Sequence, residues 1–366
     1  MVEWKKLGEI ANITIGEFVH RDKQNPKAKY PVYNGGTTYT GFYEYYNNTG
    51  NKIVISARGY AGFVNRVFDN YWAGNSSYSI DINNSKVLWH YVYYYLKNEQ
   101  YNIMSMQQKG GGLAAISKKQ VQELLIPIPS LSEQSRIVSI LDTFTSSISN
   151  LKQQIEERRK QYEYERDLLL DLEGKEGVEM KTLGEVANFV KDRIEASFLN
   201  SQNYVSVENL LKDKAGRIDS ENVPFKGNWS CYKHGDVLIG NIRPYLRKIW
   251  LADRKGGTNG DVLIIRPNEF ILPQFLYCVL ASEKFFEYYN QTAKGGKMPR
   301  GEKSRALSYI IPLPPLSTQS RIVSILDTFE QSISNLEEQL AMREKQYEYY
   351  RNQLLTFEGE EERGKT

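Results

Sequence analysis

Few side chains in this sequence have the types and spacing that catalysis requires. The chain has three histidines (His20, His90 and His234) and two cysteines (Cys231 and Cys278), with neither a Cys-x-x-Cys pair nor a ligand-like histidine spacing. A zinc site needs such a cluster. The sequence also lacks a G-x-S-x-G elbow, an H-E-x-x-H helix and a G-x-G-x-x-G after a predicted strand. We therefore expect a chain without catalytic residues, metal or cofactor.

One phosphate-binding motif matches by letters alone. Gly359–Thr366 reads GEEERGKT and fits the pattern G-x-x-x-x-G-K-[ST]. A P-loop joins a strand to a helix, so that backbone N–H groups and the helix N-terminus face the phosphates. Here three glutamates lie inside the loop and no helix-forming segment follows. We interpret this stretch as an acidic tail.

Recognition of a polyanion is the better-supported chemistry. A lysine-glycine-glycine sequence occurs twice at matching places, after a candidate helix and before a proline-rich stretch. Glycine lets a backbone approach a ligand closely, and lysine binds phosphate groups. A flexible, solvated loop is the alternative, and two copies at corresponding positions weaken it. The candidate residues of these loops are Lys109, Gly110, Gly111, Lys294, Gly295, Lys297, Arg300 and Lys303.

A second pair of basic loops follows strand-like runs. Arg58 comes directly after the run Lys52–Ser56, and the stretch RPYLRK supplies Arg243, Arg247 and Lys248. An arginine in such a loop can bind a guanine edge with two hydrogen bonds or bridge phosphates. A surface arginine that only closes a turn is an equally open interpretation.

These loops must be positioned by a stretch that occurs twice. Ser135–Leu151 reads SRIVSILDTFTSSISNL and Ser320–Leu336 reads SRIVSILDTFEQSISNL, 185 positions apart with two differences. Each copy follows a proline-rich lead, IPIPSLSEQ or IPLPPLSTQ. A repeat of this quality indicates a duplicated unit and an internal pseudo-two-fold arrangement.

Apolar residues in each copy recur in alternating steps of four and three. This is the a/d pattern of a helix that packs against a partner helix. No proline or glycine follows for about 38 residues, which predicts helices of roughly 57 Å. The simplest partner of each helix is the other copy, in an antiparallel coiled coil that acts as a spacer. The predicted packing residues are Ile137, Leu141, Phe144, Ile148, Leu151, Ile322, Leu326, Phe329, Ile333 and Leu336.

The charge follows the same division. The segments 1–129 and 176–315 carry net charges of +5 and +4, whereas 130–175 and 316–366 carry −2 and −4. Each globular segment opens with a related sequence, WKKLGEIAN or MKTLGEVAN. Both mix strand-like runs with a candidate helix, over residues 87–101 in the first and 273–289 in the second. We predict an α+β chain in which two mixed α/β domains (1–129 and 176–315) are joined by two long helices (130–175, and 316–366 with the acidic tail).

Other compositional features bound the location of the protein. No apolar run approaches the 18 or so residues of a membrane span, and the first eleven residues lack the apolar core of a signal peptide. Two cysteines in 366 residues do not make a disulfide framework. We expect a cytoplasmic protein without membrane contact.

The repeated pattern P-x-L-S-x-Q-x-R-I-V-x-I-L-D resembles the specificity subunit of Type I restriction–modification systems. The two globular segments add to the likeness, since each opens with LGE-[IV]-A-N and closes on a Lys-Gly-Gly loop. The resemblance covers nearly the whole chain. It implies two target recognition domains, each reading one half of a bipartite site in double-stranded DNA, and two conserved spacer helices. The basic loop residues named above then become the candidate DNA-binding residues.

The resemblance also implies a set of partners. In the family, the helices dock two copies of a methyltransferase subunit, which binds S-adenosylmethionine and methylates adenine N6. A restriction subunit joins through that complex. This chain would then be non-catalytic and hold no cofactor itself.

Two other functions stay open at this point. A stand-alone sequence-specific DNA-binding protein would share the basic domains but bind without a partner. A coiled-coil adaptor with non-DNA ligand domains would bind its ligand with little dependence on salt, unlike a protein that contacts phosphates.

Overall fold

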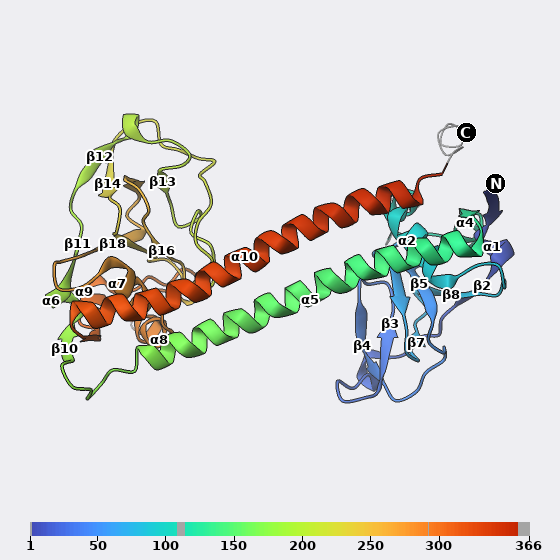
Figure 1. Cartoon of the computed structure of the whole chain (residues 1–366), viewed down its shortest axis with the longest axis horizontal. Helices are drawn as coiled ribbons and strands as arrows, with labels where there is room; N and C mark the ends of the chain where they lie inside the picture. Colours follow the sequence, from blue (N-terminus) through green and yellow to red (C-terminus); the bar gives the residue numbers. More distant parts are fainter. Residues whose placement is uncertain (1, 108–113, 292, 358–366) are drawn as a thin grey trace. The chain divides into compact units, whose positions relative to one another are not determined.

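The computed structural model describes residues 2–107, 114–291 and 293–357 (Figure 1). The chain forms two compact units, the first made of Met1–Lys152 with Glu338–Thr366 and the second of Gln153–Glu337. Each unit combines a mixed α/β domain with parts of two long helices, α5 (Leu131–Leu169) and α10 (Leu316–Leu355). The predicted fold class is confirmed.

Two sheets form the α/β domain of the first unit. The main sheet is antiparallel with strand order β2-β8-β5-β6, and the smaller sheet has the order β4-β3-β7. The central strand β5 is buried from Ile53 to Ser56, as expected of a strand covered on both faces. The strands are β2 (Ala11–Ile15), β3 (Tyr30–Tyr33), β4 (Tyr39–Tyr43), β5 (Lys52–Ser56), β6 (Val64–Val67), β7 (Trp72–Ala73) and β8 (Ser77–Ile82).

The helix expected near residues 87–101 is divided in two. Helix α2 ends at Asn98, and the chain turns before the next helix begins at Gln100. Tyr91, Val92 and Leu96 of α2 are buried in the core of the unit. The helices of this domain are α1 (Leu7–Ile10), η1 (Arg21–Lys23), α2 (Trp89–Asn98), α3 (Gln100–Ser105) and α4 (Lys118–Gln122).

The second unit repeats this plan. Its main sheet has the order β11-β18-β15-β16 and its smaller sheet the order β12-β14-β17-β13. Both smaller sheets contain one parallel pair, β3 with β7 and β13 with β17. The strands are β11 (Ala187–Phe189), β12 (Arg193–Glu195), β13 (Tyr204–Val205), β14 (Asn228–Tyr232), β15 (Val237–Gly240), β16 (Ile249–Leu251), β17 (Gly256–Thr258) and β18 (Val262–Pro267).

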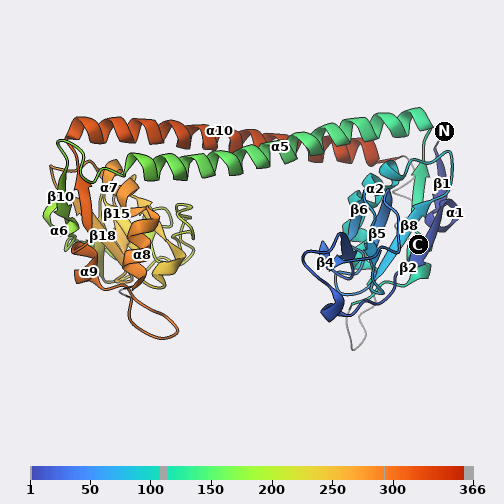
Figure 2. The same ribbon diagram turned by 90° about the horizontal axis from the view of Figure 1, so that it is seen from below.

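In the second unit α7 lies between the main sheet and the long helices (Figure 2). Phe275 and Leu276 of α7 share a core with Ile322 and Leu326 of α10. The single helix expected over 273–289 is again divided, into α7 and α8. The helices of this domain are α6 (Leu183–Val186), η2 (Ala196–Phe198), η3 (Pro244–Leu246), α7 (Pro273–Leu280), α8 (Glu283–Gln291) and α9 (Lys303–Leu307).

The duplicated sequence forms the same frame in both units. The strand β1 (Glu3–Lys6) pairs antiparallel with β9 (Leu125–Ile128), and β10 (Glu179–Thr182) pairs likewise with β19 (Ile310–Leu313). The proline-rich leads are therefore short strands. In each LGE sequence the glutamate closes a capping box, so the motif is a helix-start signal.

A buried glutamine fixes the start of each long helix. The Gln134 side chain donates to Lys86 O and Pro129 O, both at 2.9 Å, and accepts from Leu88 N at 2.8 Å. Gln319, at the same place in the second copy, has a matching set of three bonds. The repeated glutamine thus joins each long helix to its lead and to the segment before α2 or α7.

The long helices pack antiparallel within each unit. In the first unit Phe144 stacks on Tyr350 with ring centroids 5.3 Å apart, and Lys152 pairs with Glu344 at 2.8 Å. These contacts join α5, as far as its middle at Lys152, to the C-terminal part of α10.

The second unit holds the opposite ends of the same helices. Arg159 pairs with Glu337 at 2.6 Å, and the Tyr162 hydroxyl donates to Glu330 at 2.9 Å. These bonds join the C-terminal part of α5 to α10, as far as its middle at Glu337.

The predicted packing residues divide into two groups. The four at the helix starts are fully buried because they enter the α/β cores, which periodicity alone did not predict. The buried group is Ile137, Leu141, Ile322 and Leu326, and the half-buried group is Phe144, Ile148, Leu151, Phe329, Ile333 and Leu336.

Candidate nucleic-acid interface

In the first unit Arg58 lies in the loop that follows the central strand β5. Ala57 is buried, and Arg58, Gly59 and Tyr60 are exposed, with 58 % of Tyr60 accessible. The chain turns because Gly59 adopts a φ of +74°, a region that glycine enters without steric cost. The loop therefore presents an arginine and a tyrosine together.

Two neighbouring segments hold this loop. Gly59 N donates to Ala114 O at 3.1 Å, and Tyr60 N donates to Gly35 O at 2.9 Å. A Cβ at position 35 would lie 2.2 Å from Arg58 O, so only glycine permits this approach. The backbone under Arg58 is thus fixed from two sides.

The second unit builds the equivalent loop after β15. Arg243 N donates to Pro299 O at 2.7 Å, and Gly301 N donates to Asn241 O at 3.1 Å. Asn241 in turn accepts a hydrogen bond from the hydroxyl of the buried Tyr289. The loop that follows β15 and the loop before α9 therefore form one surface.

The second of these loops carries the predicted lysine-glycine-glycine residues. Lys294 and Arg300 form a backbone bridge, and Gly295 turns the chain with a φ of +114°. The Arg300 side chain pairs with Asp261 at 3.1 Å and that of Lys294 with Glu302 at 2.8 Å. The lysine hydrogen bond lowers the pKa of the Glu302 carboxyl.

Three of the predicted basic residues in this region are exposed and make no internal side-chain bond to the described residues. Within the described part of the chain, Arg243, Lys297 and Lys303 have neither a hydrogen-bonding nor an ion-pairing side-chain partner. Their donors are available to a ligand.

Two of the predicted residues make internal bonds instead. Arg247 pairs with Glu283 of α8 at 2.9 Å. Lys248 turns inward and donates to Val207 O at 2.6 Å, and burial lowers the pKa of its ammonium group. The corresponding prediction in the first unit, Lys109, Gly110 and Gly111, lies outside the described residues.

These surfaces present donors and, among the residues that the structure describes, no metal cluster. They offer cationic and amide donors, and no group of three metal-ligating side chains occurs in the described ranges. Both cysteines are buried, and burial raises the pKa of their thiols, for Cys278 to about 12. A thiol in that state is a poor nucleophile.

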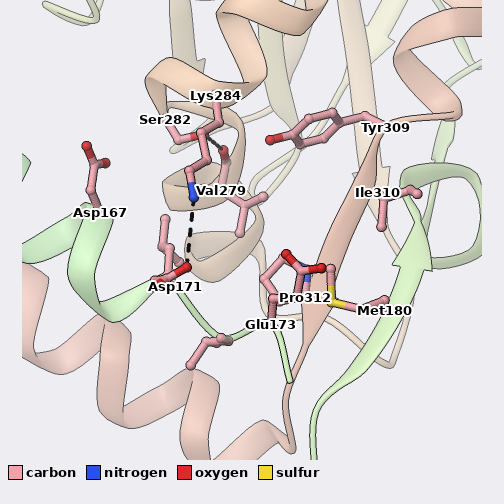
Figure 3. A pocket seen from close by; sticks show the side chains of 12 residues that line it. Asp167, Asp171, Glu173, Met180, Val279, Ser282, Lys284, Tyr309, Ile310 and Pro312 are labelled. Atoms are coloured by element: carbon pink, nitrogen blue, oxygen red, sulfur yellow. Dashed lines mark hydrogen bonds and ion pairs between the residues drawn. The ribbon is translucent and has the colours of Figure 1, made fainter. Parts of the chain in front are cut away.

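A small cavity of about 130 Å³ lies elsewhere in the second unit, at the end of α5 (Figure 3). Asp171 at its edge pairs with Lys284 at 3.9 Å, and Met180, Tyr309 and Ile310 supply apolar lining. Its lining contains neither a histidine nor a cysteine, and the hydroxyl of its serine, Ser282, donates to Val279 O at 2.7 Å. We regard it as part of the junction between α5 and the α/β domain.

The sequence did not predict the residues that hold the loops in place. Asp261, Asn241 and Tyr289 position the loops of the second unit, and Gly35 does so in the first. The paired glycines at positions 35 and 36 were a signal for close backbone approach. The other three residues have no sequence signature, because their partners lie 39 or more positions away.

Comparison with known proteins assigns this arrangement to a class. The family model for the Type I restriction modification DNA specificity domain matches the chain twice, over residues 1–158 and 175–342. The chain therefore belongs to the family of Type I restriction–modification DNA specificity subunits.

Individual relatives match the chain over nearly its whole length. The EcoR124I/EcoR124II specificity subunit of Escherichia coli is 28 % identical over 398 residues, covering 97 % of this chain and 94 % of its own. The crystal structure of a Type I system S subunit from M. genitalium has the same fold, with a TM-score of 0.67, 20 % identity and 97 % of each chain covered. A protein from a structural study of Type I complex assembly has a TM-score of 0.56 at 18 % identity, covering 97 % of this chain and 96 % of that one.

Among the helices in the described ranges, none combines the length and the apolar character needed to cross a bilayer.

Proposed function

We propose that the chain is the DNA-reading subunit of a Type I restriction–modification enzyme, with one half of a bipartite site bound by each unit. The observation that carries this proposal is the repeated loop pair. In both units a loop after the central strand is hydrogen-bonded to the loop before a short helix, α4 or α9, and bears an exposed arginine.

The charges of the loops favour DNA as the ligand. We assign Arg58 to the first half-site and Arg243, Lys297, Arg300 and Lys303 to the second. Cationic side chains bind phosphates, and arginine also matches a guanine edge. The two units differ in their loop residues, so we expect two different half-site sequences.

The partners follow from the family and from the repeat. The nearly identical sequences of α5 and α10 offer one surface twice, which suits two copies of a methyltransferase subunit and, through them, restriction subunits. We place S-adenosylmethionine and the chemistry of adenine methylation in that partner. The assembly would work in the cytoplasm, where the DNA is.

The test compares N6-methyladenine across the host genome with this gene intact and with it deleted. We expect deletion to remove one bipartite methylated motif, which would reveal both half-sites. An unchanged methylome, with the methyltransferase partner expressed, would refute the proposal. A stand-alone DNA-binding protein would instead bind its site tightly when purified alone, and an adaptor would bind its ligand with little dependence on salt.

A further inference from the structure

Two residues of different type occupy one equivalent position in the two units. Gly59 N donates to Ala114 O in the first unit, and Arg243 N donates to Pro299 O in the second. The backbone bridges next to these bonds also correspond, Arg58 with Ala115 and Ile242 with Arg300. By this correspondence, the residue of the first unit that is structurally equivalent to Arg243 is Gly59, not Arg58.

The backbone at this position is left-handed in both units. Gly59 has a φ of +74°, and Arg243 has a φ of 51° and a ψ of 60°. A glycine adopts this conformation freely, whereas an arginine strains its Cβ against the backbone. The second unit therefore holds an arginine where a glycine would fit with less strain. A side chain kept under such strain points to a function.

Other strained cations in the second unit have internal roles. Arg247 (φ 51°) pairs with Glu283, and Lys214 (φ 63°) pairs with Glu163 at 3.5 Å and with Glu283 at 2.9 Å. Arg243 differs, because among the described residues its guanidinium has no hydrogen-bond or ion-pair partner and is exposed. The backbone of Arg243 is held by the fold, but no contact of its side chain within the described residues requires an arginine there.

The surroundings of Arg243 favour a base over a phosphate as its ligand. The residue lines a cavity of about 740 Å³ whose other walls come from the segments 204–222, 242–248 and 259–261 and from Met298. Besides Arg243, one cation, Lys248, is among the lining residues. Carboxylates that line the same cavity disfavour a phosphate and can accept hydrogen bonds from the amino groups of bases. Two of them, Asp219 and Asp261, also pair with Arg217 and Arg300. The carboxylates that line the cavity are those of Glu208, Asp219, Glu221 and Asp261.

We propose that Arg243 reads a guanine edge in the second half-site and determines specificity there, while the first unit, with Gly59, reads its half-site through other side chains. Arginine binds guanine O6 and N7 with two hydrogen bonds, the commonest base-specific contact in the major groove. This inference rests on the proposed function.

The replacement R243G tests the inference with the backbone intact. Glycine already occupies this position in the first unit, so we expect the R243G subunit to assemble with its partners and to melt at an equal or higher temperature. In a host that expresses the complex, we expect the methylated motif to keep its first half-site and to become degenerate at one guanine position of the second. Discrimination at that base pair should fall on the order of ten- to hundredfold.

Two further variants make the result decisive. K214G also replaces a cationic residue whose backbone is left-handed with glycine, in the same unit. We expect it to leave the motif unchanged. R243K keeps the charge but loses the two-pronged geometry, so it should show the same degenerate position as R243G.

Three outcomes would overturn the assignment. They are an unchanged motif in R243G, a uniform loss of methylation at all sites without degeneracy, and full specificity in R243K. A wild-type complex without any bipartite motif would refute the proposed function instead, whatever the variants do.

Discussion

The Lys97 ammonium lies half-buried, 4.0 Å from the centroid of the Phe63 ring, and donates to Val64 O at 2.9 Å. Burial lowers the pKa of Lys97 from 10.5 to about 8, because the charged form loses hydration. Between about pH 8 and pH 10.5, the Lys97 side chain is protonated in the unfolded chain but has lost its proton in the folded chain. The free energy of unfolding should therefore rise with pH across that window.

We expect an NMR titration of the Lys97 side chain to show a midpoint near pH 8. The assignment is made by the disappearance of the signal in K97M. Unfolding measured from pH 8 to 10.5 should show wild type gaining stability relative to K97M. A midpoint of 10 or above would contradict the prediction.

Gly35 controls the loop that carries Arg58. A methyl group at position 35 would lie 2.2 Å from Arg58 O and must push the two backbones apart, whereas at Gly36 it would meet Thr38 O at 3.3 Å. We expect G35A to weaken recognition of the first half-site at least tenfold and to spare the second. DNA-binding assays with the assembled complex, using sites mutated in one half at a time, measure this.

The matched variant G36A should bind nearly as wild type does. Equal loss in both half-sites for G35A would mean that the change unfolds more than the loop.

At the scale of elements, the buried glutamines matter for the placement of the long helices as the apolar seam does. Gln319 is fully buried and satisfies Leu272 N, Phe270 O and Pro314 O. Replacement with leucine leaves these groups without partners. Each buried polar group that loses its partner destabilises the fold by roughly 1–3 kcal/mol. We expect Q319L to lower the free energy of unfolding of the second unit by about 3 kcal/mol.

Urea denaturation of the full chain, followed by a probe in the second unit, gives this value. The neighbouring Ser320 is exposed, and S320A should change the free energy by less than about 0.5 kcal/mol. A loss below about 1 kcal/mol in Q319L would show that water replaces the lost bonds.

The long helices were predictable because their signal is local. The repeat from Ser135 to Leu151 combines a start signal, a regular apolar seam and an absence of glycine and proline, and α5 runs 39 residues as that pattern indicates. The role of Gln134 was not predictable, since its partners Lys86 and Leu88 lie more than 40 residues away. The same limit applies to the split between α2 and α3, which depends on the local path around Glu99.

The binding loops were predictable in type but not in geometry. Composition identified Arg243 and Lys294 as cations in glycine-rich surroundings. Only the folded structure separates Arg243 from Arg247, which pairs with Glu283. Left-handed backbone at an arginine has no sequence signature, because propensity predicts glycine or asparagine there.

At the scale of the whole molecule, the duplication divides the chain into an exchangeable part and a constant part. The frame strands pair in the same register, with Trp4 opposite Pro127 and Met180 opposite Pro312. Between the frames, Ala11–Ile116 and Ala187–Gly301 begin and end at equivalent hydrogen-bonded positions. A segment cut at these positions should fold on either frame.

We therefore predict that replacing Ala11–Ile116 with a second copy of Ala187–Gly301 yields a chain that assembles with the same partners. Since both recognition surfaces would then be those of the second unit, the methylated motif should contain the second half-site twice and lack the first. Methylome sequencing of a host that expresses this chain gives the motif directly. Persistence of the original first half-site would show that residues of the frame or of the long helices read DNA, and would place specificity outside the loops.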